Sequence, residues 1–296
     1  MTEKVGFVGL GVMGQPMAKN VLRGGFPLVV FNRTASRAVP LVKRGARQVN
    51  SARAAAEASD ILVTMLADSA TVEAVVFGQD GILSGLRPGS VLIDMSTGSP
   101  DTARNVAVAV RKKGADFLEV PVSGSVNLAQ AGTLTLVAGG REGTFERCRP
   151  LLSAMGEAMF HVGEVGMATQ LKLSLNLMVA GMMQVLAESL VLGVKAGLNP
   201  TTMLEVIGAS AVRSPLYSFK GEALCKRDFS TTFTLKNMVK DLNLILNSGE
   251  KLGVFLPTTA VVKQLFGAAQ AQGKANQDWS AVVTVLEQIA GVEVKG

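Results

Sequence analysis

The sequence predicts an α/β protein of two domains, a doubly wound α/β domain over residues 1–163 and an all-α domain over residues 164–296. Short apolar runs rich in β-branched residues alternate with helical stretches as far as Val162, a pattern typical of a doubly wound sheet. After Val165 only helical patterns recur. A chain of 296 residues with 48% hydrophobic content exceeds the usual size of one core, and it can fill two.

The first domain is expected to alternate strands with helices. The expected strands are residues 4–8, 28–31, 61–66, 91–94, 116–120, 133–138 and 158–162. The expected helices are residues 15–23, 35–45, 51–57, 99–113 and 142–155. Ser51 and Ser99 are favoured N-cap residues, and Pro100 suits a first helical position. Ligands of an open α/β sheet bind at the carboxyl ends of its strands, so the segments after Leu66 and Asp94 are expected at the ligand-binding edge.

The second domain is expected to be a set of helices separated by Gly, Asn or Pro. The expected ranges are 165–196, 201–209, 215–225, 235–252, 258–272 and 279–290. The first of these could be mistaken for a membrane span. Its longest charge-free run, Leu173 to Ala187, holds 15 residues, and a bilayer requires roughly 20. We therefore expect a buried helix and no membrane partner.

The first expected strand leads directly into the motif Gly9-x-Gly11-x-x-Gly14. In a dinucleotide site the first glycine permits the tight turn, the second lets the backbone approach a pyrophosphate, and the third lets the next helix pack on the strand. The phosphates then lie at that helix's N-terminus. The motif alone also fits a structural turn, since the chain holds 32 glycines. The strand before it and the helix after it favour a Rossmann-type cofactor site.

The end of the second expected strand indicates which dinucleotide binds. An NAD site places an Asp or Glu there on the ribose hydroxyls, whereas this chain reads Asn32-Arg33-Thr34 and has no acidic residue between Glu3 and Glu57. Nothing in that stretch repels a 2′-phosphate, and Arg33 and Arg37 offer guanidinium groups. We therefore expect NADP rather than NAD. The alternative is that both arginines are ordinary solvated residues.

The net charge of +6 would suit an anionic partner. The chain has no run of Lys and Arg and no basic stripe with interleaved aromatic residues, so we expect no nucleic-acid partner. The charge is better suited to attracting an anionic cofactor and substrate.

Metal chemistry is not expected. Cys148 and Cys225 form no CxxC motif, and His161 is the only histidine, so zinc lacks its usual ligands. The chain starts a strand almost at once, without a signal-like segment, and we expect a cytoplasmic setting.

Lys172 is the candidate for acid–base chemistry. Reduction of a carbonyl needs a group that gives the oxygen a proton. Tyr217 is the only tyrosine and has no lysine four positions on, and His161, at a strand end, fits a packing role. Lys172 lies near the start of a very apolar helix, where burial lowers an amine's pKa, and Asn176 lies one turn later on the same face. The alternative is a lysine that extends to solvent.

Together these motifs resemble the β-hydroxyacid dehydrogenase family. The resemblance covers nearly the whole chain and includes the 3-hydroxyisobutyrate dehydrogenases and the NADP-dependent glyoxylate and succinic semialdehyde reductases. It rests on Gly9-Leu10-Gly11-x-Met13-Gly14-x-Pro16-Met17-Ala18-x-Asn20, Asp94-Met95-Ser96-Thr97, Pro121-Val122-Ser123-Gly124, Gly132-Thr133-Leu134, Lys172 with Asn176, and Lys240-Asp241.

The resemblance implies an NADP(H)-dependent enzyme that interconverts a short hydroxyacid and its semialdehyde, with Lys172 as general acid/base. It implies substrate binding by Ser123, Gly124, Ser125, Asn176, Phe233 and Asp241. It implies cofactor binding by Gly9, Leu10, Gly11, Val12, Met13, Gly14, Asn32, Arg33, Thr34, Met65, Leu66, Thr97 and Lys240. It also implies a homodimer or homotetramer.

Two features leave alternatives open. Many members of the family read Ser-Gly-Gly where this chain has Ser125, so the substrate stays open among glyoxylate and the succinic, methylmalonate and tartronate semialdehydes. The imine reductases of the family usually lack the lysine, so Lys172 argues against that branch. The alternative from another class is a non-catalytic NADP-sensing or nucleic-acid-binding module. A 6-phosphogluconate-type dehydrogenase would need a longer helical part.

Overall fold

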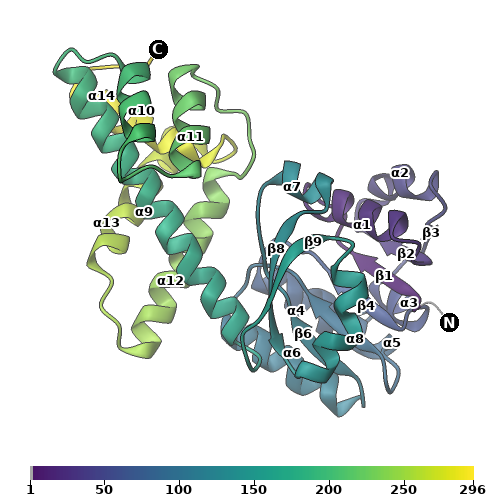
Figure 1. Cartoon of the computed structure of the whole chain (residues 1–296). Coiled ribbons are helices and arrows are strands. Elements are labelled where there is room, and N and C mark those ends of the chain that lie inside the picture. The colour runs from purple at the N-terminus through teal and green to yellow at the C-terminus, as the bar shows by residue number, and fades with distance from the viewer. Residues whose placement is uncertain (1–2) are drawn as a thin grey trace. The chain divides into compact units, whose positions relative to one another are not determined.

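The computed structural model describes residues 3–296, and the chain divides into two compact units, Met1–Lys172 and Leu173–Gly296. The strands belong to the first unit and helices build the second (Figure 1). The division falls inside helix α9 (Met167–Lys195), whose first turn belongs to the first unit. The predicted fold class, an α/β domain followed by an all-helical region, is confirmed.

Strands and helices alternate along the first unit. Its strands are β1 Val5–Val8, β2 Leu28–Phe31, β3 Arg47–Gln48, β4 Ile61–Thr64, β5 Val91–Asp94, β6 Asp116–Glu119, β7 Val122–Ser123, β8 Leu134–Gly140 and β9 Gly156–His161. Its helices are α1 Gly14–Arg23, the 3₁₀ turn η1 Ala35–Ala38, α2 Val39–Val42, α3 Ala52–Glu57, α4 Ser69–Phe77, α5 Ile82–Gly85, α6 Pro100–Lys112, α7 Val126–Ala131 and α8 Glu142–Leu152. The predicted caps are present, because the hydroxyls of Ser51 and Ser99 accept amide hydrogens from α3 and α6.

One sheet contains all of these strands in the order β3-β2-β1-β4-β5-β6-β8-β7, with β9 paired to β8. The pairs from β3 to β6 are parallel, and β8 joins β6 in the antiparallel direction. The last residues of four parallel strands stand in register, namely Val8, Thr64, Asp94 and Glu119. This row marks the carboxyl edge of the sheet, where ligands of such folds bind.

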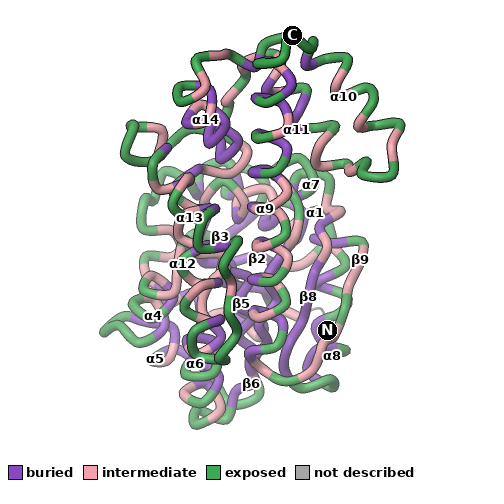
Figure 2. The backbone as a smooth tube through the Cα atoms, turned by 90° about the vertical axis from the view of Figure 1, so that its left-hand side faces the viewer, coloured by how far each residue is buried: buried purple, intermediate pink, exposed green. Residues whose placement is uncertain are grey.

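Helices cover both faces of the sheet. Successive strand residues point to opposite faces, so each strand contributes side chains to both cores. Ile61 and Val63 of β4 belong to one hydrophobic core, together with residues of α1, α2 and α8. Leu62 belongs to the other core, which α3, α4, α5 and α6 complete. The strand β8 is buried along nearly its whole length (Figure 2). Such two-sided burial explains the almost continuous apolar runs of the parallel strands.

The second unit is helical. Beyond α9 it contains α10 Pro200–Ala209, α11 Pro215–Cys225, α12 Leu235–Leu252, α13 Pro257–Ala269, the π turn η2 Gln270–Lys274, the 3₁₀ turn η3 Trp279–Val282 and α14 Val283–Ala290. The rings of Phe266 and Trp279 stack near the centre of its core. All helices expected from the sequence are present here, because Gly, Asn or Pro separates stretches that are long enough to be recognised as helical.

Helix α9 corrects the expectation of a buried helix. One side packs in the second core through residues such as Leu173, Met183 and Leu190. The opposite side exposes an apolar stripe at seven-residue intervals, formed by Leu171, Met178, Val185 and Leu192. By length and composition α9 could cross a membrane, a test that the core helix of a soluble protein also passes.

Several elements of the first unit differ from the prediction. The single helix expected over residues 35–45 is divided into η1 and α2, since Pro40 cannot donate the amide hydrogen that a continuous helix requires. The helix expected over residues 142–155 ends at Leu152, with Pro150 in its last turn. The sequence did not predict β3, β7, α4, α5 or α7. The boundary after Gly163 stays a prediction.

Candidate active site

The glycine loop connects β1 to α1 at the carboxyl edge of the sheet. Gly9 has φ +98°, and a Cβ atom on it would lie 2.3 Å from the carbonyl oxygen of Met65. A Cβ atom on Gly14 would lie 1.9 Å from the carbonyl oxygen of Gly9, so the helix can approach the strand only with glycine there. A Cβ atom on Gly11, in contrast, would have no atom closer than 4.0 Å. The backbone at Gly11 is therefore open to a ligand, which fits a pyrophosphate.

Asn32 organises the loop that the sequence assigns to the cofactor. Its side-chain oxygen accepts the amide hydrogen of Leu10 at 2.8 Å, and its amide donates to the carbonyl of Thr34 at 2.9 Å. Arg33 and Arg37 are exposed beside it. Within residues 3–296 no hydrogen bond or ion pair occupies either guanidinium group. Both are thus available to an anionic group at the end of β2.

Asp94 ties together the loops that follow β4 and β5. One of its carboxylate oxygens accepts hydrogen bonds from the hydroxyls of Thr64 at 2.7 Å and Ser96 at 2.6 Å. The Ser96 hydroxyl in turn accepts the amide hydrogen of Leu66 at 2.9 Å. Burial raises the pKa of Asp94, and the bonds from Ser96 and Thr64 offset part of this rise. This network holds the Leu66 amide, and the predicted cofactor residues Met65, Leu66 and Thr97 are half-buried at the edge.

Glu119, at the carboxyl end of β6, holds the beginning of α9. One carboxylate oxygen accepts the amide hydrogens of Gly166 at 2.6 Å, Ala168 at 2.9 Å and Thr169 at 3.3 Å. The other accepts the Thr169 hydroxyl at 2.6 Å. Burial raises the pKa of Glu119, and these hydrogen bonds act against the rise. Half-buried Lys172 follows in the next turn of α9.

The predicted carboxylate-binding turn follows β6 on the same side of the sheet. Ser123 ends β7, where it pairs with Thr135 of β8. Gly124 has φ +141°, which side chains rarely allow, and Ser125 precedes α7 without capping it through its hydroxyl. The two serine hydroxyls are therefore not consumed by helix capping.

In the second unit, the structure brings together Asn176 and Asp241. The Asn176 amide donates to one Asp241 carboxylate oxygen at 2.7 Å, and the Lys240 ammonium lies 3.0 Å from the other. Asn176 is 7% exposed and Asp241 1%. Phe233 lies instead in the loop before α12, where its carbonyl accepts the amide hydrogen of Trp279. The structure thus joins three of these predicted residues in one network, and Phe233 is outside it.

A second buried network holds the Phe233 loop. The Lys220 ammonium donates to Asp278 at 2.6 Å, and both side chains are almost completely buried. Asp278 also accepts hydrogen bonds from Thr232 and Ser280. Burial acts to raise the pKa of Asp278, but the charge and hydrogen bond of Lys220 and the bonds from Ser280 outweigh it, and the pKa is lowered.

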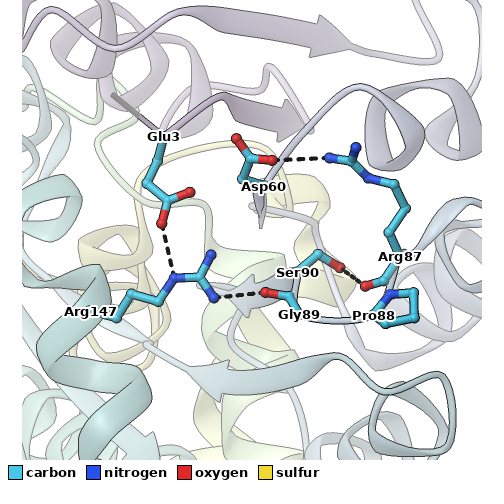
Figure 3. Close-up of a pocket in the computed structure, with 7 residues that line it drawn as sticks. All are labelled: Glu3, Asp60, Arg87, Pro88, Gly89, Ser90 and Arg147. Atoms are coloured by element: carbon cyan, nitrogen blue, oxygen red, sulfur yellow. Dashed lines mark hydrogen bonds and ion pairs between the residues drawn. The ribbon is translucent and has the colours of Figure 1, made fainter. Parts of the chain in front are cut away.

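The pocket drawn in Figure 3 lies at the opposite edge of the sheet. It has a volume of about 260 Å³ and borders the amino ends of β1, β4 and β5. Its charged groups satisfy one another, since Arg147 pairs with Glu3 at 2.9 Å and Arg87 with Asp60 at 3.0 Å. Parallel sheets bind ligands at their carboxyl ends, so we do not place the cofactor here.

Sequence reasoning missed Glu119 and the Lys220–Asp278 pair. The available signal for Glu119 was an acidic residue directly after the apolar Phe117 and Leu118 of a strand, since a buried charge needs partners. For Lys220 and Asp278 there was no local signal, because 58 residues separate them.

Two family descriptions match this chain in succession. The NAD binding domain of 6-phosphogluconate dehydrogenase matches residues 4–163. The NAD-binding domain of NADP-dependent 3-hydroxyisobutyrate dehydrogenase matches residues 166–286. With the glycine loop, these matches define a dehydrogenase that uses a nicotinamide dinucleotide.

The relatives narrow the class further. The chain is 41% identical over 294 residues to 2-(hydroxymethyl)glutarate dehydrogenase of Eubacterium barkeri, covering 99% of this chain and 98% of the relative. It is 35% identical to the chloroplastic glyoxylate/succinic semialdehyde reductase 2 of Arabidopsis thaliana, covering 97% and 80%. Psf3, solved in complex with NADP+ and 2-OPP, superposes with a TM-score of 0.87 at 29% identity, covering 95% of this chain and 99% of Psf3. The chain belongs to the β-hydroxyacid dehydrogenase family, and it is an NAD(P)-dependent oxidoreductase of hydroxyacids.

Proposed function

We propose that this enzyme uses NADP(H) to interconvert a short carboxylate-bearing semialdehyde and its hydroxyacid, with Lys172 as general acid/base. One observation carries the assignment. The Glu119 cap fixes the start of α9 at the carboxyl edge of the sheet, and Lys172 follows three residues after Thr169. In this assignment the Lys172 ammonium would lie close to the ligand-binding edge and give the developing alkoxide its proton.

The exposed arginines support NADP as the cofactor. The first carboxylate after Glu3 is Glu57, so the end of β2 offers Arg33 and Arg37 to a 2′-phosphate without a competing acid. The open backbone at Gly11 suits the pyrophosphate. NADPH, when bound, supplies the hydride. The chain's own residues bind and orient the reactants and supply the proton.

The relatives' names support a carboxylate-bearing substrate, because 2-(hydroxymethyl)glutarate and succinic semialdehyde both carry one. Ser123, Gly124 and Ser125 would hold that carboxylate through hydroxyls and backbone amides. The assignment of Asn176, Phe233 and Asp241 to substrate binding stays a prediction. In this assignment the Asn176–Asp241 bond orients the asparagine amide, whose oxygen then faces a substrate hydroxyl.

Two measurements test the function. The first compares oxidation of NADPH and NADH with glyoxylate and with succinic, methylmalonate and tartronate semialdehydes. The second compares Lys172→Ala and Lys172→Arg with the native enzyme. Lys172→Ala should lower kcat by roughly two to four orders of magnitude and leave NADPH affinity nearly unchanged. Lys172→Arg should not restore turnover, because a guanidinium does not release its proton at working pH.

The same measurements exclude or support the alternative. A non-catalytic NADP-sensing or nucleic-acid-binding module would bind NADPH without turnover of any of the four aldehydes. A lysine that merely extends to solvent would leave kcat within a few-fold of native in both variants. Near-native turnover in Lys172→Ala would therefore remove the acid/base assignment.

The exposed stripe of α9 supports self-association as a homodimer or homotetramer. Leu171, Met178, Val185 and Leu192 repeat at heptad intervals, which suits helix-to-helix packing. Light scattering of the native chain and of Val185→Lys with Leu192→Lys tests this. The double variant should have the smaller mass if copies meet at this stripe, and equal masses would contradict the assignment.

A further inference from the structure

We propose that Glu119 is a positioning residue for Lys172, a role that rests on the acid/base function proposed above. Glu119 does not lie on the helix that carries the lysine. It ends β6, and its two carboxylate oxygens take up three backbone amides and one hydroxyl at the beginning of α9. It therefore connects the sheet to the turn that precedes Lys172.

Glu119 is itself held rigidly. Its strand lies between β5 and β8, where Glu119 stands opposite Asp94 on one side and Gly139 on the other. A Cβ atom at Gly139 would lie 2.5 Å from a Glu119 carboxylate oxygen, so the carboxylate occupies space that only a glycine leaves free. The side chain is 2% exposed. A group so enclosed has little freedom, and what it binds is fixed to the sheet.

The partners of Glu119 are the groups that a helix start leaves without intrahelical acceptors. The positive end of the helix dipole favours a carboxylate at this place. Within residues 3–296 no ion pair involves Glu119, so the amides and the Thr169 hydroxyl are what compensates its burial. Removing the carboxylate would leave these buried donors unsatisfied. The first turn of α9 would then shift or unwind so that water could accept their hydrogen bonds.

Lys172 lies within reach of that change. It follows Thr169 by three residues, a rise of about 4.5 Å along an α-helix, and residues three apart are neighbours on a helix surface. Proton transfer requires hydrogen-bond distance between donor and acceptor. A misplacement of about 1 Å can lower a rate by roughly a hundredfold. The cap is thus positioned to control turnover without touching the reactants.

The test compares Glu119→Ala with Glu119→Gln. Glutamine keeps an oxygen for the three amides, and its NH₂ group can donate to the Thr169 hydroxyl, so turnover should stay within about threefold of native. Alanine removes every acceptor, and kcat should fall by roughly ten- to a hundredfold. NADPH affinity, measured by fluorescence titration, should not change. Hydrogen exchange at Gly166, Ala168 and Thr169 should accelerate in Glu119→Ala only.

A matched pair covers the case in which Glu119→Ala does not fold. Thr169→Val removes the hydroxyl at nearly constant volume, whereas Thr169→Ser keeps it. Thr169→Val should lower kcat and shift the lysine limb of the pH–rate profile, and Thr169→Ser should behave as native. Equal kcat and equal pH profiles in the two variants would overturn the proposal.

Lys172→Ala separates this proposal from the proposed function. If Lys172→Ala abolishes turnover while folded Glu119→Ala keeps native kcat and pH profile, the positioning role is wrong and the acid/base role stands. If Glu119→Ala lowers only the melting temperature, with native turnover per folded molecule, Glu119 is a structural residue alone. If Lys172→Ala itself keeps native turnover, both assignments fall.

Discussion

The two units of this enzyme compensate buried charge in different ways. In the α/β unit, Asp94 and Glu119 are surrounded by hydroxyls and backbone amides, and within residues 3–296 neither has a cationic partner. In the helical unit, Asp278 is paired with Lys220 and Asp241 with Lys240. Neutral hydrogen-bond donors therefore compensate these buried carboxylates in the α/β unit, and ammonium groups compensate them in the helical unit.

The difference has a functional meaning. At the carboxyl edge of the sheet, no carboxylate captures the exposed Arg33 and Arg37, so their charge stays available for an anionic cofactor. In the helical unit, the ion pairs neutralise charge internally and fix loops and helices, as Asp278 does for the segment around Phe233. Loss of Arg33 should therefore change cofactor binding, and loss of the Lys220–Asp278 pair should change stability.

The largest effect is expected at the buried ion pair. Lys220→Met removes the charge at similar length and leaves the Asp278 carboxylate buried without its cation. The free energy of unfolding should fall by about 3–5 kcal/mol. Lys226→Met, which breaks the exposed pair with Glu222, should change it by less than about 0.5 kcal/mol. Urea unfolding of both variants measures this. Similar losses in the two would show that burial does not distinguish the pairs.

A smaller effect is expected from Arg33→Ala. Loss of one charge-assisted contact to the 2′-phosphate should reduce the preference for NADPH over NADH about tenfold, or roughly 1.4 kcal/mol. The change should appear mainly in the KM for NADPH, and stability should be native. Arg23→Ala, an exposed arginine at the other end of α1, is the control. Steady-state kinetics with both cofactors measures the preference, and an unchanged preference would contradict the assignment of Arg33.

The smallest effects concern pH, and they should have opposite signs in the two units. The lowered pKa of Asp278 means that its stabilisation is present above the unfolded value near 3.9 and is lost as pH falls through the folded pKa. The raised pKa of Asp94 means the reverse, with its contribution greatest below that value and lost as pH rises through the folded pKa.

Asp278→Asn and Asp94→Asn test these signs. As the solution is acidified, the stability gap between native protein and Asp278→Asn should narrow, while native protein should gain relative to Asp94→Asn. Urea unfolding across acidic and neutral pH measures both gaps. If acidification changed both stability gaps in the same direction, the pKa values of Asp278 and Asp94 would not be shifted in opposite directions.

Much of the fold could be predicted because it is encoded locally. The apolar run of β1, the spacing of Gly9, Gly11 and Gly14, and the long apolar stretch of α9 each lie within one segment. Lys172 could be noticed for the same reason, as a charge at the start of an apolar helix. Short elements such as α5 and α7 could not, since about one turn of helix leaves too little periodicity.

The contacts that organise the site are long-range, and this limited the prediction. Glu119 and Thr169 are 50 residues apart, and Asn176 and Asp241 are 65 residues apart. Asn32 illustrates a different limit. It was predicted as a cofactor residue, and the structure shows its side chain bonded to the Leu10 amide. The residues next to Asn32 in the sequence do not indicate this contact. The cofactor role of Asn32 stays a prediction.

The bond between Glu119 and α9 also determines where the chain can be divided for study. A fragment that stops at Gly163, between the two family matches, would contain the whole sheet but none of the four donors that Glu119 binds. In that fragment the Glu119 carboxylate, which the native fold encloses, would be exposed to solvent or buried without its hydrogen-bond donors. A fragment that continues through Lys172 keeps the donors and the lysine. Those nine additional residues, six of which belong to α9, are part of what completes the α/β half as an isolated protein.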